Sequence, residues 1–328
     1  MTIVERLSAG ERLVLDGGTG SELQRRGVDV LQQVAKRLKA WSALANLTHA
    51  DVVQQVHQDY LRVGADIITS NNFWTSPTRL ETVGMRDRWR EHAAAAVEIA
   101  LRARDAAARE RPGTTVYVAG GIAPPALQDA TTDGPVSDVE RLGKDAFQDE
   151  MAAHAQLLAA SGVDCIWCEF LACIDECVAA YDATAGTGLP VFIGTRNLNA
   201  DGSMAFGESF RELAAALGER PVAGILLMCS NPEAISAGLP LLRAAYGGVI
   251  GAYANLGYNP TGPVANRPLL SNQLPSSGPD IIQAADYSPS RVARFASDWL
   301  DAGAQIVGGC CASGPEHIAA IRRVVSAA

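Results

Sequence analysis

The sequence predicts an α/β protein in which eight parallel strands close into a (β/α)8 TIM barrel. Short apolar runs rich in Val and Ile recur along the 328 residues without polar alternation, as expected for strands buried on both faces. A Gly-rich or polar break and a longer helix-like segment follow the runs, which is the order of a parallel α/β fold. Eight such runs fit a closed barrel better than an open sheet. The predicted strands are residues 12–16, 65–69, 115–119, 165–169, 190–194, 224–229, 248–253 and 305–309.

A doubly wound open sheet is the alternative fold. That fold more often carries a Gly-rich phosphate-binding turn after its first strand. The sequence has no linker-like break and no low-complexity segment. Residues 1–328 are therefore predicted to form a single domain.

The segments between the strands carry helix signals. Apolar residues within 51–63 fall on one helical face. Residues 138–160 are predicted to form one long helix. Three later helices are expected to begin at Pro232, at Pro289, and at the capping-box pair Ser313 and Glu316.

Two segments are longer than a minimal barrel requires. One spans residues 27–41 after the first strand, and the other spans residues 256–287 between the seventh and eighth strands. Loops of this length are usually functional or make contacts between subunits. A homo-oligomer is therefore an open alternative to a monomer.

Charge and hydropathy exclude several partner classes. The net charge is −9, from 27 basic and 36 acidic residues, so the sequence offers no basic patch for nucleic acid or an anionic membrane. The N-terminal residues lack the apolar core of a signal peptide, and no apolar run is long enough to cross a bilayer. We therefore expect a cytoplasmic protein.

Three of the seven cysteines fall at predicted strand ends. Cys229 ends the sixth strand, and Cys310 and Cys311 follow the eighth. The C-terminal strand ends form the active face of a barrel, and catalytic zinc takes three protein ligands and one exchangeable position. Gly308 and Gly309 are expected to let the backbone bend so that both adjacent thiols reach one metal. The alternative is that these cysteines are small buried core residues.

The other four cysteines are expected to be structural, because a Cys-x-x-Cys spacing within a strand turns the two side chains apart. A second metal site is the minority alternative. These residues are Cys165, Cys168, Cys173 and Cys177.

Several segments, in this order along nearly the whole chain, resemble the homocysteine S-methyltransferase family, which comprises zinc-dependent barrel enzymes that convert homocysteine to methionine. The element Gly-Gly-Cys-Cys with a distant upstream cysteine is the most specific of them. The matching segments are residues 15–23, 41–43, 56–61, 64–71, 169, 253–255 and 308–311.

The resemblance implies a site for an amino-acid thiol. It implies that Cys229, Cys310 and Cys311 hold Zn2+, which would bind the substrate thiol and make it a nucleophile. It also implies that Asp16 and Glu169 hold the substrate ammonium group, and two carboxylates at one barrel mouth suit that role. The substrate carboxylate would meet backbone amides around Gly17 and the loop after the second strand. In this interpretation Asn71 and Asn255 belong to the same substrate site.

The resemblance also implies a methyl donor that is an onium ion: S-methylmethionine, S-adenosylmethionine or a betaine. Aromatic faces attract such cations, and Trp41, Phe73 and Trp74 lie on loops at the expected catalytic face. The alternative is that these aromatic residues only pack the first long loop against the barrel. None of the histidines is an evident general base. His57, His92 and His154 are expected to be structural, and His317, in the first turn of the final helix, is expected to face solvent or to pack.

The sequence departs from the family pattern at the substrate site. Met228 stands where Asn is usual, Ala254 stands where Pro is usual, and residues 120–125 lack the familiar Ser-x-Gly. These changes leave three alternatives open: a changed thiol or selenol acceptor, a non-catalytic zinc- and thiol-binding barrel, or the substrate half of a cobalamin-dependent enzyme. A barrel lyase is disfavoured because no lysine falls at a predicted strand end.

Overall fold

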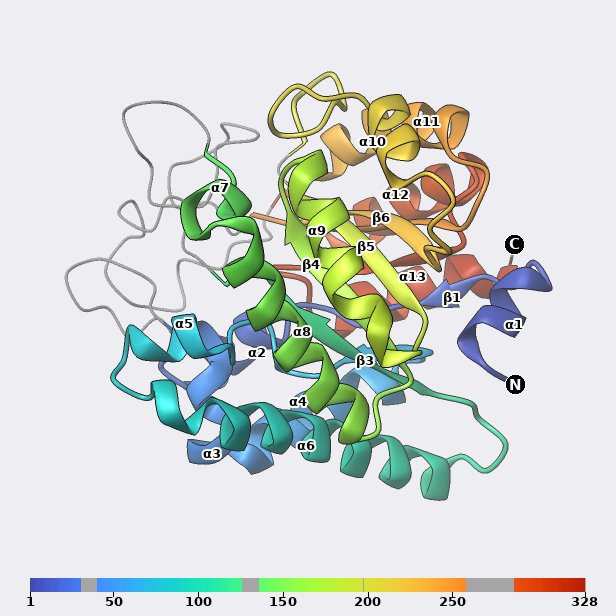
Figure 1. Cartoon of the computed structure of the whole chain (residues 1–328). Coiled ribbons are helices and arrows are strands. Elements are labelled where there is room, and N and C mark those ends of the chain that lie inside the picture. The colour runs from blue at the N-terminus through green and yellow to red at the C-terminus, as the bar shows by residue number, and fades with distance from the viewer. Residues whose placement is uncertain (31–39, 126–135, 197, 258–285, 328) are drawn as a thin grey trace.

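The computed structural model describes residues 1–30, 40–125, 136–196, 198–257 and 286–327, and these form a barrel of parallel strands surrounded by helices (Figure 1). The strand order is β1-β8-β7-β6-β5-β4-β3-β2, with every paired strand parallel. The strands are β1 (Leu13–Val14), β2 (Ile67–Thr69), β3 (Tyr117–Ile122), β4 (Cys165–Leu171), β5 (Val191–Arg196), β6 (Gly224–Met228), β7 (Ile250–Ala254) and β8 (Ile306–Gly309).

The barrel closes between its first two strands. Leu13 of β1 pairs with Ile306 of β8, and Leu15, just after β1, forms a parallel bridge with Ile67 of β2. The Asp16 N–H donates to the Ile67 carbonyl at 3.0 Å, which continues this junction. The closed arrangement confirms the predicted (β/α)8 barrel and excludes the open doubly wound sheet.

Helices cover the outside of the strands (Figure 1). Short 3-10 turns occur at Trp41–Leu44, Arg86–Arg88 and Ala185–Thr187. The helices are α1 (Ile3–Ser8), α2 (Thr19–Arg25), α3 (Ala45–Thr48), α4 (Ala50–Arg62), α5 (Pro77–Glu81), α6 (Trp89–Glu110), α7 (Asp138–Leu142), α8 (Lys144–Ala160), α9 (Ile174–Thr184), α10 (Phe210–Leu217), α11 (Pro232–Ala245), α12 (Pro289–Asp301) and α13 (Pro315–Ala327).

Most predicted helices are found, with two corrections. Pro232 and Pro289 open α11 and α12, as expected. The single helix predicted over residues 138–160 is wrong, because Gly143 adopts a φ of 81° and separates α7 from α8. A positive φ is readily available to glycine and lies outside the right-handed helical region.

The capping box predicted at Ser313 is also wrong. Helix α13 begins at Pro315, and the Ser313 hydroxyl has no hydrogen-bond partner among the described residues. The backbone of Ser313 is instead held by the strand-end loops, since its carbonyl accepts from Gly18 N–H at 3.1 Å and from the Tyr60 hydroxyl at 2.9 Å. The Gly314 N–H donates to His317 Nδ1 at 3.1 Å.

The barrel interior is packed with apolar side chains, and α1 supplies two more at one end. Ile3 and Leu7 are buried in the same cluster as the inward-facing strand residues. The Gln305 side chain donates to the Leu7 carbonyl at 2.8 Å, and the Tyr117 hydroxyl donates to the Met1 carbonyl at 2.8 Å. Helix α1 therefore plugs the barrel at the end where the strands begin.

The described part of the chain contains no helix long and apolar enough to cross a membrane. The segment predicted as a loop at residues 256–287 lies largely outside the described residues, as do residues 31–39 of the first long segment. His57, His92 and His154 are buried, and burial lowers the pKa of His57 to about 4 and that of His154 to about 3.

Candidate active site

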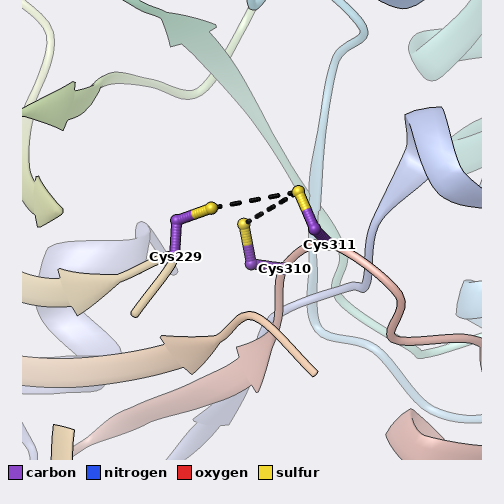
Figure 2. A group of neighbouring side chains, drawn as sticks. All are labelled: Cys229, Cys310 and Cys311. Atoms are coloured by element: carbon purple, nitrogen blue, oxygen red, sulfur yellow. Dashed lines mark hydrogen bonds between the residues drawn. The ribbon is translucent and has the colours of Figure 1, made fainter. Parts of the chain in front are cut away.

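Three thiols meet at the C-terminal ends of β6 and β8. Cys229 follows β6, and Cys310 and Cys311 follow β8, with the three sulfur atoms converging on one point (Figure 2). The Cys311 Sγ lies 3.9 Å from the Cys229 Sγ and 4.0 Å from the Cys310 Sγ. All three sulfur atoms lie within 4.8 Å of one another, so this cluster is a candidate metal site.

Backbone contacts between neighbouring strands hold these cysteines in place. The Cys229 N–H donates to the Tyr253 carbonyl, and the Cys310 N–H donates to the Ala254 carbonyl. Cys229 has a φ of 46°, a left-handed conformation that non-glycine residues seldom adopt outside functional sites. This conformation turns the chain at the end of β6 and presents the thiol to the barrel mouth.

Gly308 and Gly309 act differently from the sequence expectation. Neither has a positive φ, so neither provides a bend that is reserved for glycine. A methyl group on Gly308 would lie 2.7 Å from the Leu15 carbonyl oxygen, and one on Gly309 would lie 2.3 Å from Ser313 Cβ. These glycines are required because the cysteine-bearing strand packs directly against the loop after β1.

The pKa values of the three thiols are shifted in different directions. Hydrogen bonds from Cys229 and Cys310 hold the pKa of Cys311 well below its usual range. The bonds to Cys229 and Cys311, together with burial, raise the pKa of Cys310. A cluster that already favours one thiolate is a suitable starting point for binding a cation.

Asp16 and Glu169 lie beside the thiols and are both buried. Burial raises the pKa of Asp16 well above its ordinary value, against the opposing effect of a 2.9 Å hydrogen bond from the Thr69 N–H. Burial likewise raises the pKa of Glu169 to about 7, although the Tyr253 hydroxyl donates to it at 3.1 Å. Within the described chain, neither carboxylate has an Arg or Lys ion pair.

Gly121 makes room for one of these carboxylates. A methyl group at Gly121 would lie 2.8 Å from Glu169 Oε2. This glycine lies within β3, because the strand runs from Tyr117 to Ile122 rather than over the predicted residues 115–119. Because β3 extends to Ile122, Gly121 is a strand residue that lies next to the Glu169 side chain on the neighbouring strand β4.

The expected contacts of the substrate carboxylate are only partly present. The Gly18 N–H is already bonded to the Ser313 carbonyl, and the Ser70 N–H to the Ala119 carbonyl. Asn71 lines the cavity and is fixed by the Ser42 hydroxyl, which donates to its side-chain oxygen at 2.6 Å. Asn255 does not line the cavity, and its amide lies 3.9 Å from the Cys229 sulfur.

A cavity of about 160 Å3 joins these groups. Trp41, Phe73 and Trp74 line it together with the cysteines and carboxylates, at the face where the sequence predicted them, and their role in binding a donor stays a prediction. Phe73 packs on Trp74 with ring centroids 5.4 Å apart, and edge-on against Phe170 at 5.3 Å. The indole of Trp41 occupies the space that a side chain at Gly20 would need. The wall is therefore largely aromatic.

The sequence interpretation missed charged residues on the same wall. Arg196 was missed because the fifth strand was predicted to end at residue 194, whereas β5 reaches Arg196. A predicted strand two residues longer would have placed this arginine at a strand end. Asp138 and Arg79 lie on helices outside the barrel, and no spacing in the sequence pointed to them. All three line the cavity.

The remaining cysteines stay outside the site, as expected. Cys165 packs inside the barrel, whereas Cys168 packs between the strands and the helices, because alternate strand residues face opposite sides. None of the described histidines lines the cavity. The other buried cysteines of this group are Cys173 and Cys177.

Fold and site together define a (β/α)8 protein with a three-thiol centre and two unpaired carboxyl groups at the mouth of its barrel. The family model described as homocysteine S-methyltransferase matches residues 13–325. The chain therefore belongs to the homocysteine S-methyltransferase family.

Characterised relatives match over nearly their full length. The homocysteine S-methyltransferase of Escherichia coli is 26% identical over 313 residues, covering 94% of each chain. The selenocysteine Se-methyltransferase of Brassica oleracea is also 26% identical, over 341 residues that cover 97% of this chain and 90% of the relative. The metallated form of the homocysteine methyltransferase MmuM from Escherichia coli superposes with a TM-score of 0.76 at 24% identity, covering 97% of this chain and 98% of that one. The superposition supports the barrel fold.

Proposed function

We propose that this protein is a zinc-dependent S-methyltransferase that moves a methyl group from an onium donor to the thiol of homocysteine, giving methionine. The observation that carries the proposal is the three-thiol cluster at the mouth of a barrel of this family. The structure of the similar MmuM protein is described as its metallated form, which supports the proposal that this protein also binds a metal.

The donor set fits zinc. A zinc–sulfur bond of about 2.3 Å in tetrahedral geometry places thiolate sulfurs roughly 3.8 Å apart. The two recorded separations from Cys311 are 3.9 Å and 4.0 Å. Cys229, Cys310 and Cys311 would hold the ion and leave one position for a substrate thiol. Bound there, zinc would lower the pKa of that thiol so that it meets the methyl donor as a thiolate.

Asp16 and Glu169 would hold the ammonium group of the acceptor. Both are buried, and neither has a cationic side chain as its partner within the described chain. Burial raises the pKa of Glu169 to about 7, so an arriving ammonium group would supply the charge that keeps it ionised. Tyr253 would orient this carboxylate, because its hydroxyl donates to Glu169 and accepts from Trp167 at 3.0 Å.

The identity of the methyl acceptor is a separate part of the proposal. A selenocysteine methyltransferase is as similar to this chain as a homocysteine enzyme is, so a selenol or a different thiol is the second candidate. Met228 also supports this alternative, because its thioether sulfur accepts from the Phe170 N–H and lies 3.1 Å from the Tyr253 hydroxyl oxygen, where the family usually has an amide side chain.

We further propose that residues 1–328 act as one domain in a reducing compartment such as the cytoplasm. All seven cysteines are free, which suits that setting. Retained thiols would be necessary for a thiolate metal site.

Metal analysis and a substrate panel together test the function. We expect about one zinc per chain and methionine formation from homocysteine with at least one onium donor. Cys310→Ala should lose both, whereas Cys177→Ala, which removes a buried thiol outside the cluster, should keep both. Transfer of methyl by metal-free wild-type protein would contradict the mechanism. Zinc binding without product from any acceptor and donor would instead indicate a non-catalytic barrel.

A further inference from the structure

Arg196 is a buried cation beside the thiol cluster. It ends β5 in register with Met228, the residue before Cys229, and its side chain lines the cavity. Only 5% of the residue is exposed. Burial lowers its pKa, which shows the cost of placing this charge here, and the nearby carboxylates of Glu176 and Asp138 act in the opposite direction. Among the described residues neither carboxylate forms an ion pair with Arg196, and a buried arginine on a cavity wall without an ion pair indicates a binding role.

The contacts of Arg196 fix its direction but leave its charge available. Its Nε donates to the Phe170 carbonyl at 2.8 Å, and its guanidinium lies 4.3 Å from the centre of the Phe170 ring. Phe170 has a φ of 66°, a strained conformation that places both groups next to the arginine. Its two terminal nitrogens have no hydrogen bond within the described residues. They are the two donors that bind a carboxylate side by side.

Asp138 supplies the opposite charge on the same cavity wall. It is 2% exposed, and its Oδ1 has no hydrogen-bond partner among the described residues. It forms no ion pair with Arg196 in this part of the chain, although the two charges are close enough to influence each other. The neighbouring Glu176 accepts from the N–H groups of Asp138 and Ala172, and its charge raises the pKa of both Asp138 and Arg196.

A cation and an anion that line one cavity without pairing with each other form a receptor for a zwitterion. Building on the proposed methyl transfer, we propose that Arg196 binds the carboxylate of the methyl donor and Asp138 binds its ammonium group. The donor is then an onium ion built on an α-amino acid, such as S-methylmethionine. Phe73, Trp74 and Phe170 would face the onium centre.

This assignment separates the two substrates. The acceptor ammonium is assigned to Asp16 and Glu169, which have no cation beside them, whereas the Arg196 and Asp138 pair offers both signs of charge. A betaine could use Arg196 through its carboxylate but has no N–H for Asp138. A simple trialkylsulfonium ion has no carboxylate for Arg196 and no N–H for Asp138, so it would rely on the aromatic wall and on the negative charge of the cavity. The three ligand types therefore report on the two residues separately.

Calorimetric binding to the purified protein tests the proposal without requiring turnover. The ligands are S-methylmethionine, glycine betaine and trimethylsulfonium. Arg196→Gln should weaken the first two by roughly 10- to 100-fold, because a charge-assisted bidentate contact is lost, and should not weaken trimethylsulfonium, which has no carboxylate. Asp138→Asn should weaken S-methylmethionine more than the other two ligands, because only S-methylmethionine has an ammonium N–H for this carboxylate. Arg196→Lys should recover part of the loss, and Arg102→Gln, on the outer face of α6, should have no effect.

Methyl-transfer kinetics then test the assignment of Arg196 to the methyl donor independently of the proposed methyltransferase activity. The Michaelis constant for S-methylmethionine should rise in Arg196→Gln while that for the acceptor stays constant. Equal weakening of all three ligands, an unchanged affinity for S-methylmethionine, or a rise confined to the acceptor would overturn the assignment. Wild-type protein that binds S-methylmethionine through Arg196 yet transfers no methyl group would overturn the proposed function and leave this assignment standing.

Discussion

At the scale of single residues, burial of carboxyl groups is the main electrostatic feature of the barrel mouth. Asp16, Glu169 and Asp138 all line the cavity, and burial is the largest cause of the raised pKa in each. Low-dielectric surroundings disfavour the ionised form unless a cation compensates. These residues therefore make binding of a positively charged group more favourable, which agrees with substrates that carry ammonium and onium centres.

Asp138 should make stability depend on pH in a defined direction. Burial and the nearby Glu176 raise its pKa from 3.8 to about 7, so the folded protein keeps a proton that the unfolded chain has lost between these values. The stability from this group is complete below pH 4 and decreases as the pH rises to 7. Relative to wild type, Asp138→Asn should gain roughly 2–3 kcal/mol on going from pH 5 to pH 8.

Urea unfolding at the two pH values measures this difference. Asp105→Asn, which changes an exposed carboxyl group on α6, serves as the control and should follow the wild type. Identical pH dependence in wild type and Asp138→Asn would show that Asp138 is ionised in the folded protein at both pH values.

At the scale of elements, the contact between β8 and the loop after β1 sets the position of the thiols. Gly308 packs against the backbone of Leu15, and Gly309 packs against Ser313 and Gly17. The loop after β1 carries Asp16, so one contact positions both the carboxylate and the cysteines. A change in this contact should affect the whole site.

Gly308→Ala should therefore destabilise the fold by about 1–3 kcal/mol and reduce the metal content, because the added methyl group would overlap the Leu15 backbone. Gly247→Ala is the matched control, since a methyl group there would meet nothing within 4 Å. Urea midpoints and zinc analysis measure the two effects. Equal stability of both variants would show that the strand can move away from Leu15 at little cost.

At the scale of the whole molecule, the two ends of the barrel have different roles: one end carries the candidate active site and the other contributes mainly to stability. The thiols and carboxylates lie where the strands end, while α1 plugs the opposite end through Ile3 and Leu7. Barrel folds commonly divide their two faces in this way. Changes at the plug should alter stability without altering the active site.

Leu7→Ala tests this division. Removal of a side chain that is 3% exposed should cost about 2–4 kcal/mol and lower the melting temperature. Val4→Ala, on the same helix but 37% exposed, should change stability little. Zinc content and methyl transfer measured well below the melting temperature should match the wild type in both variants. Loss of metal from folded Leu7→Ala would show that the two ends are coupled.

The sequence alone determined the fold and the thiol centre. Eight unalternating apolar runs can be buried on both faces only in a covered parallel sheet, and the three cysteines were recognisable because they end such runs. Asp16, Glu169 and the aromatic residues Trp41, Phe73 and Trp74 were found by the same logic, and the structure places all of them on one cavity. The approximate position of each strand along the chain is predictable because its hydrophobic pattern is local, whereas the residue at which a strand ends is not.

Only the tertiary structure revealed the second set of charges and the function of the glycines. Asp138 reaches the cavity from a helix outside the barrel, and Arg196 reaches it because β5 runs two residues further than its apolar pattern predicts. The need for Gly308 arises from the backbone of Leu15, a residue far away in the sequence. Contacts between distant segments depend on how the strands and helices pack together, and no local pattern encodes that packing.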